Sequence, residues 1–270
     1  MGLIEFLIFV VIGCGVGFLA GLFGVGGGFV MVPFLILSYE HLGISPSILT
    51  HLAIGTSLFV VIFSGTASAY QQKKQGNIEW RAAFLIGFSS VVTAFATAKV
   101  AAALSGRHLR VAFAIIVMGA TLRMLTESQV KAEKRLELVA KPKPLCLVGV
   151  GLAAGIVSAL AGIGGGVFTI PIMYQVLNMP IKLAIGTSSV AIVITALVSV
   201  IGYMINGMGR PGLPEWSIGF VDLHRGIALA IGSLLLARVG AYVSFRTHPY
   251  RLRKLFALFV ILISIYILLK

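Results

Sequence analysis

The sequence predicts an all-α polytopic membrane protein built from two repeats of inverted topology. Three observations carry this prediction. The chain is 59% hydrophobic and 11% charged, whereas soluble globular domains are about half apolar and a quarter charged. Long apolar stretches recur along the chain, and a glycine-rich motif interrupts them at matching positions in the two halves.

The long apolar stretches each approach the roughly 20 residues that an α-helix needs to cross about 30 Å of hydrocarbon. They are Leu3–Leu22, Leu52–Tyr70, Ala82–Leu104, Leu109–Leu125, Leu145–Leu160, Leu183–Ile205, Ile227–Val243 and Leu255–Leu269. Two further runs, Phe29–Leu37 and Val167–Leu177, are too short to span alone. We therefore expect about eight to ten hydrophobic segments. The first is predicted to be a transmembrane helix rather than a signal peptide, because it carries Glu5 and lacks a cleavage site.

An internal repeat divides the chain into two halves. The run Gly24–Pro33 matches Gly162–Pro171, and every glycine and the proline recur in place. Downstream, Ala53–Ser57 recurs as Ala184–Ser188, with the sequence Ala-Ile-Gly-Thr-Ser in both halves. Because the markers keep the same order, a duplication explains them better than chance.

Weaker markers and a polar seam complete the domain organisation. Glu79-Trp80 is aligned with Glu215-Trp216. The seam, residues 127–144, is rich in charge and contains two prolines, which is typical of a cytoplasmic linker or a short surface helix. The predicted units are a first transmembrane repeat at 1–126, the linker at 127–144 and a second repeat at 145–270.

The orientation prediction follows from the basic residues. Each half is interpreted as a glycine-broken, re-entrant first element followed by three full transmembrane helices. If the broken element enters and leaves on one side, each half crosses an odd number of times, and the second half must be inverted. A cytoplasmic linker then places most basic residues inside, as expected for inner or plasma membrane proteins, and both termini outside. A chain of ten crossings fits the same topology, so whether the short runs cross or re-enter stays open.

This orientation divides the lysines and arginines unevenly. Those placed inside are Lys73, Lys74, Arg81, Arg123, Lys131, Lys134, Arg135, Lys141, Lys143, Lys182, Arg238, Arg246, Arg251, Arg253 and Lys254. Those placed outside are Lys99, Arg107, Arg110, Arg210, Arg225 and Lys270.

The two glycine runs are the first candidate substrate site. Clustered glycines break a helix, since glycine adopts backbone conformations closed to other residues. Within a membrane such backbone is tolerated where it is buried in protein or lines a cavity, and a following helix N-terminus favours an anion. Interrupted segments at matching positions also indicate a transporter's central site. The predicted substrate-binding residues are Gly26, Gly27, Gly28, Gly164, Gly165 and Gly166.

Close helix packing is the alternative interpretation of these glycines. It is the preferred one for a second set with four-residue spacing, which is typical of helix-packing faces. This set comprises Gly13, Gly17, Gly21, Gly151 and Gly155.

Hydroxyl side chains are the second candidate feature. Thr56, Ser57, Thr187 and Ser188 close the repeated Ala-Ile-Gly-Thr-Ser motif. Such hydroxyls can bond the backbone one turn back or donate to an oxyanion, and the sequence leaves both possibilities open. We include them among the predicted substrate-binding residues.

Several function classes are disfavoured by the sequence. The formal charge of +13 would suggest nucleic acid in a soluble protein, but here it is explained by membrane orientation. Cys14 and Cys146 have no metal-ligand spacing, so neither a metal nor another cofactor is expected. The eight acidic residues fall at segment ends or in loops. The sequence thus predicts no enzyme and no buried carboxylate relay; the expected partners are the lipid bilayer and a small anion, and the oligomeric state stays open.

At the paired glycine and Ala-Ile-Gly-Thr-Ser motifs the sequence resembles the TauE/SafE family of sulfite and organosulfonate exporters. The resemblance covers essentially the whole chain. It implies export of small sulfur-containing anions such as sulfite, sulfoacetate or related organosulfonates. An importer or channel for a related anion such as thiosulfate or sulfate, or a membrane scaffold without transport, stays an alternative.

Overall fold

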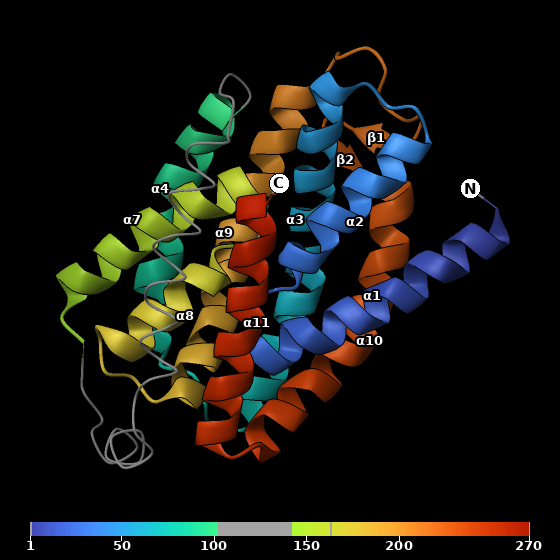
Figure 1. Cartoon of the computed structure of the whole chain (residues 1–270). Helices are drawn as coiled ribbons and strands as arrows, with labels where there is room; N and C mark the ends of the chain where they lie inside the picture. The colour runs from blue at the N-terminus through green and yellow to red at the C-terminus, as the bar shows by residue number, and fades with distance from the viewer. Residues whose placement is uncertain (1, 102–141, 163, 270) are drawn as a thin grey trace.

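The computed structural model describes residues 2–101, 142–162 and 164–269, which are almost entirely helical (Figure 1). The helices are α1 (Leu3–Phe23), α2 (Gly28–His41), α3 (Pro46–Lys74), α4 (Trp80–Ala101), α7 (Pro144–Ala161), α8 (Gly166–Gln175), α9 (Ile181–Gly207), α10 (Leu223–Arg246) and α11 (Pro249–Leu269). A short antiparallel hairpin, β1 (Ser217–Ile218) and β2 (Val221–Asp222), precedes α10.

Five of the described helices are long and apolar enough to cross a membrane. They are α1, α3, α4, α9 and α10, while α2 and α7 are shorter apolar helices. The prediction of a helical protein with several membrane spans is therefore confirmed. The predicted segment Leu109–Leu125 and nearly all of the linker at 127–144 lie outside the described residues, so the total number of spans stays a prediction.

Small residues join the helices of one half to those of the other. On α1, a Cβ added at Gly13, Gly17 or Gly21 would overlap the backbone of α10. On α7, a Cβ at Gly151 or Gly155 would overlap α4. Helix-packing glycines at this spacing allow two backbones to approach closely. The packing role predicted for these glycines is confirmed.

The directions of the packed helices follow from the same contacts. Gly13 faces Leu229 and Gly21 faces Ala237, so α1 and α10 run parallel. Gly151 faces Ile86 and Gly155 faces Ser90, so α7 and α4 also run parallel. At the centre, α3 and α9 run antiparallel, since Ser68 near the end of α3 lies 3.0 Å (Oγ to Oγ) from Ser189 near the start of α9.

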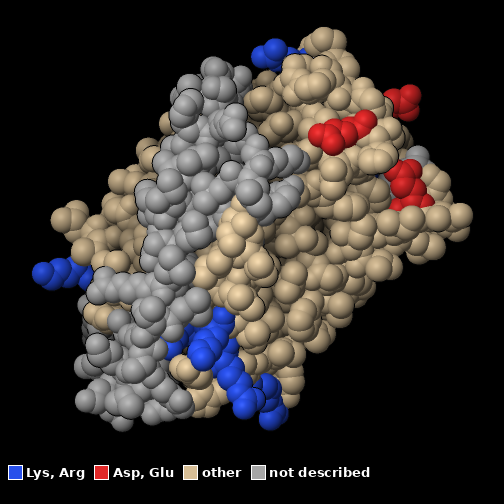
Figure 2. All heavy atoms as spheres, viewed as in Figure 1, with Lys and Arg blue, Asp and Glu red and all other residues tan. Residues whose placement is uncertain are grey.

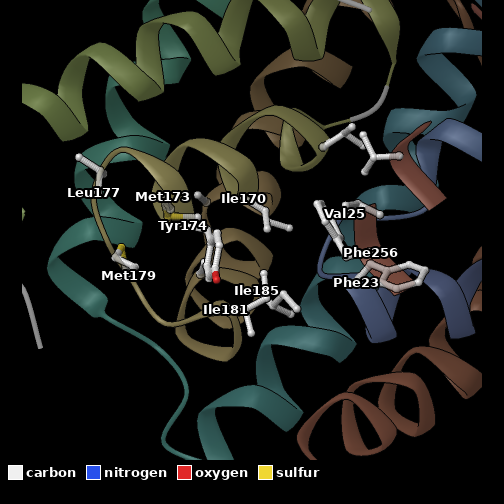
Figure 3. Close-up of a cluster of buried hydrophobic side chains, with 14 of the residues drawn as sticks. Phe23, Val25, Ile170, Met173, Tyr174, Leu177, Met179, Ile181, Ile185 and Phe256 are labelled. Carbon is white, nitrogen blue, oxygen red and sulfur yellow. The ribbon is translucent and has the colours of Figure 1, made fainter. Parts of the chain in front are cut away.

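A hydrophobic core crosses the boundary between the halves (Figure 3). It brings Phe23 and Val25 of the first half together with Ile185 and Phe256 of the second. The rings of Phe23 and Phe256 meet edge to face, with centroids 5.9 Å apart. The two halves of the chain therefore share this core.

Most described charges separate towards opposite ends of the molecule, as one face shows in Figure 2; the exceptions include Glu79 at the start of α4, and Arg210 and Arg225 near the starts of β1 and α10. We call the end at the starts of α1, α3 and α10 the acidic end; its acids are Glu5, Glu40, Glu215 and Asp222. We call the end at the starts of α4, α7, α9 and α11 the basic end. Its described basic residues are Lys73, Lys74, Arg81, Lys143, Lys182, Arg246, Arg251, Arg253 and Lys254.

Candidate substrate site

Both glycine runs interrupt the chain between two helices with nearly the same backbone geometry. The break between α1 and α2 has φ angles of 66°, 76° and 78° at Gly24, Gly26 and Gly27. The break between α7 and α8 has 68°, 74° and 80° at the corresponding Gly162, Gly164 and Gly165. Positive φ in this region favours glycine over every other residue, so the repeated glycines reflect a repeated backbone conformation.

The two breaks meet in the interior. A Cβ built on Gly166 would lie 2.7 Å from the Cα of Val25, in the opposite break. Gly26 and Gly164 both face the same two side chains, Val61 of α3 and Ile192 of α9. The predicted glycines of the two halves are thus brought together, with α3 and α9 on either side.

Serines of the repeated motif tie each break to the other half. The Ser57 hydroxyl is placed to donate to the carbonyl oxygen of Gly162 at 3.0 Å or of Gly28 at 3.2 Å. The Ser188 hydroxyl donates to the carbonyl oxygen of Gly24 at 3.1 Å. Both serines are fully buried. The equivalent serines therefore make reciprocal bonds, each stabilising the break of the opposite repeat.

Other hydroxyls at the breaks were missed by the sequence reasoning. Ser64 donates to the carbonyl oxygen of Gly26 at 2.7 Å. The hydroxyl oxygens of Thr169 and Ser188 are 3.1 Å apart. Ser68, already placed opposite Ser189, lies one turn beyond Ser64. The signal was present, because positions 57, 64 and 68 share one helical face.

The threonines of the motif lie elsewhere. Thr56 Oγ1 accepts from the backbone N–H of Asp222 at 2.9 Å, and Thr187 Oγ1 accepts from that of Glu79 at 3.0 Å. Asp222 in turn caps α10 by accepting from the N–H of His224 at 3.0 Å, and Glu79 accepts from the N–H of Ala82 at the start of α4. The threonines thus fix the starts of these two helices.

This geometry corrects one alignment of the repeats. The structural counterpart of Glu79 is Asp222, and not Glu215 as the sequence suggested, because the two acids occupy the same place beside the motif threonines. Glu215 comes before β1, in the loop that lengthens the second repeat.

A second correction concerns buried charge. Asp222 lies at a segment end, as predicted, because it caps the start of α10. It is nevertheless fully buried, and Arg225 beside it is 8% exposed, so the expectation that no acid is buried is wrong for Asp222. Arg225 Nη1 lies 2.9 Å from Asp222 Oδ2, and Arg225 Nη2 lies 3.1 Å from Glu5 Oε1. The first turn of α10 folds inward against α1, α2 and α3, which the sequence pattern alone does not indicate.

The groups gathered at the breaks suit binding rather than bond-making chemistry. The described residues there offer serine and threonine hydroxyls, carbonyl oxygens and the N-termini of α2 and α8. The first N–H groups of a helix lack an intrahelical acceptor and carry partial positive charge. Such donors match the oxygens of a small anion.

Comparison with known proteins identifies the family of the chain. The family model of the sulfite exporter TauE/SafE matches residues 9–267. A "probable membrane transporter protein" of Haemophilus influenzae is 31% identical over 98% of both chains. A protein of the same description from Methanocaldococcus jannaschii is 30% identical over 92% of this chain and 91% of its own. YunE of Bacillus subtilis, named in the same way, is 27% identical over 75% of this chain and 80% of its own.

No solved structure matches the chain significantly. The family model covers nearly the whole sequence, and the relatives from Haemophilus influenzae and Methanocaldococcus jannaschii align over more than 90% of both chains. They are named as transporters and not as enzymes. The chain therefore belongs to the sulfite exporter TauE/SafE family and is a membrane transporter of that family.

Proposed function

We propose that the protein exports small sulfur-containing anions, such as sulfite, sulfoacetate or related organosulfonates, by alternating access. The observation that carries the proposal is the meeting of the two glycine breaks beside Ser57 and Ser188. Substrate oxygens would take hydrogen bonds from the N–H groups at the starts of α2 and α8, around Gly26–Gly28 and Gly164–Gly166. The family description and the donor chemistry both support a small oxyanion as the occupant.

The serines would switch partners when substrate binds. In the described conformation their protons are donated to Gly24 and Gly162, and the break residues are buried. Rotation of one repeat against the other would release these carbonyls and turn Ser57 and Ser188 towards the anion. Thr56 and Thr187 would keep the helix starts in place during this movement, because their hydroxyls bond the backbone at Asp222 and Glu79.

An inverted pair of re-entrant repeats is part of this proposal. Its support is the direction of the helices: α3 and α9 are antiparallel, although they are equivalent by sequence. Glu5 near the start of α1 and Tyr39 near the end of α2 both reach the cluster of Arg225 and Asp222. The first broken element would therefore enter and leave on one side of the membrane.

The distribution of charge supports the proposed direction of transport. We place the basic end in the cytoplasm because basic residues favour that side, and the acidic end with both termini outside. A cytoplasm-negative potential favours anion exit by about 2.3 kcal/mol per charge per 100 mV. Export would then need no coupling ion.

The test uses the purified full chain in lipid vesicles loaded with radiolabelled sulfite or sulfoacetate. We expect release that is accelerated by an inside-negative potential, and acceleration by unlabelled anion outside the vesicle. Release without this counterflow would indicate a channel. Accumulation of labelled anion inside the vesicles, independent of the potential, would indicate an importer. If none of sulfite, sulfoacetate, thiosulfate and sulfate crosses the membrane, the scaffold alternative is supported.

A further inference from the structure

Arg225 in the first turn of α10 is buried beside two carboxylates and two aromatic rings. Its guanidinium bonds Asp222 and Glu5, at 2.9 Å and 3.1 Å, and lies 5.8 Å from the ring centre of Phe9 and 5.7 Å from that of Tyr39. The Nε atom is buried and has no hydrogen-bond partner among the described residues. The arginine thus keeps a buried donor that no described residue uses.

The two carboxylates are held very differently. Asp222 is fully buried, caps α10 through the N–H groups of His224 and Arg225, and lies 3.3 Å from the Tyr39 hydroxyl. The Glu5 side chain is 38% exposed, and its hydrogen bond to a described residue is the one to Arg225. Glu5 can therefore leave the arginine for solvent, whereas Asp222 cannot leave without unfolding the helix start.

The other repeat provides an internal comparison. At each end a threonine hydroxyl accepts from the backbone N–H of the acid that caps a helix, and we call this pair the capping frame. Thr187 and Glu79 form it at the basic end, and Thr56 and Asp222 form it at the acidic end. Three residues after Glu79 stands Ala82, where the acidic end has Arg225. The frame forms at one end without an arginine. Glu79 is only partly buried, whereas Asp222 is fully buried and is neutralised by Arg225. The second partner, Glu5, and the unused Nε are not needed for that neutralisation, so neutralisation does not account for them.

The cluster also connects to the central site. The Tyr39 hydroxyl lies 3.3 Å from Thr56 Oγ1, and Thr56 adjoins Ser57, which bonds the second break. A group held at Arg225 would thus lie at the outer side of the path that begins at the breaks, if the acidic end faces outward as proposed above.

We propose that Arg225 is an outer binding point for the oxyanion group of the transported anion, and that Glu5 is a built-in competitor for the same guanidinium. The carboxylate of Glu5 occupies the place of the ligand, since carboxylate and sulfonate oxygens pair with guanidinium donors in the same way. An arriving anion displaces Glu5 into solvent and binds Nη2 and the free Nε. The proposal rests on the transport function proposed above.

Binding of sodium sulfite to the purified full chain tests the competition. We expect Glu5→Gln to lower the half-saturating sulfite concentration several-fold, because the competing charge is removed. Glu40→Gln is the matched control: it removes one negative charge from an exposed side chain at the same end, and should change the value less than twofold. In the Glu5→Gln chain, adding Arg225→Lys should reverse the gain, since lysine keeps the charge but loses the fork of donors.

The outcomes separate this inference from the transport proposal. Equal shifts in Glu5→Gln and Glu40→Gln would show a general effect of charge and overturn the competition, and so would no shift in either. If wild-type vesicles still release sulfite in these cases, the transport proposal stands. If the Glu5→Gln shift is found but vesicles carry no sulfite, Arg225 is an anion site and the transport proposal fails.

Discussion

At the scale of single residues, buried hydroxyls accommodate the two glycine breaks by donating to carbonyl oxygens within them. Ser57 and Ser188 make equivalent bonds in opposite directions, to Gly162 and Gly24. A buried carbonyl left without a donor costs about 1–3 kcal/mol. The serines therefore stabilise the described conformation, and in the proposed function they would also offer donors to an anion.

Replacing either serine should destabilise the described conformation. We expect Ser57→Ala and Ser188→Ala each to reduce the free energy of unfolding by about 1–3 kcal/mol and to slow vesicle flux. Thr66→Ala is the control on the same helix, because that exposed hydroxyl bonds Ile62 of its own helix. Thermal unfolding in detergent checks the prediction, and equal losses for Ser57→Ala and Thr66→Ala would contradict it.

The glycines of the breaks should resist even a methyl group. Gly26→Ala would place alanine at a φ of 76°, which costs about 1–2 kcal/mol, and its Cβ would meet Val61 Cγ1 at 2.7 Å. We expect lost flux and a lower unfolding temperature. Gly15→Ala in α1 has open space around it and should leave both unchanged or slightly raise stability. Normal flux in Gly26→Ala would refute a functional role for the break.

At the scale of helices, reciprocal packing joins the repeats. α1 lies against α10, and α7 lies against α4, with glycines at each contact. Because each broken element packs against a long helix of the other half, we expect the two helices of each pair to move together. Close backbone contact of this kind transmits movement because packed interfaces are not continuously deformable.

A bulky residue in the α4–α7 contact should separate the two helices. In Gly155→Val the added side chain would overlap the backbone of Ser90, so we expect reduced yield of folded protein and a lower unfolding temperature. Gly149→Val on the same helix meets no atom within 4 Å at its Cβ and serves as the control. Similar unfolding temperatures for the two variants would show that this contact does not limit stability.

At the scale of the whole molecule, the separation of charge sets the expected orientation. In a chain with Cys14 and Cys146 replaced by alanine, we expect Glu215→Cys to react with a membrane-impermeant maleimide on intact cells. Lys254→Cys should react only after permeabilisation. Both positions are exposed, at the acidic and basic ends respectively, and the opposite labelling pattern would reverse the proposed topology and direction.

The sequence predicted the class of protein and the location of the breaks for physical reasons. Membrane helices must satisfy their backbone within each segment, so apolar runs of sufficient length identify spans directly. Glycine at positive φ has few substitutes, so the motif Gly24–Pro33 and its repeat predicted two matching breaks. The packing glycines of α1 and α7 were predicted by spacing alone, since a helix places every fourth residue on one face.

Only the tertiary structure decided which groups meet. Ser57 bonds Gly162, and Arg225 bonds Glu5, across 105 and 220 residues of sequence. The capping frame shows that Asp222 matches Glu79, which the nearby Glu-Trp pair obscured. No local pattern encodes such pairs, because they depend on how complete helices pack against one another. The sequence determined that two glycine breaks exist in a membrane protein; the packing of α3 and α9 determined that the breaks meet.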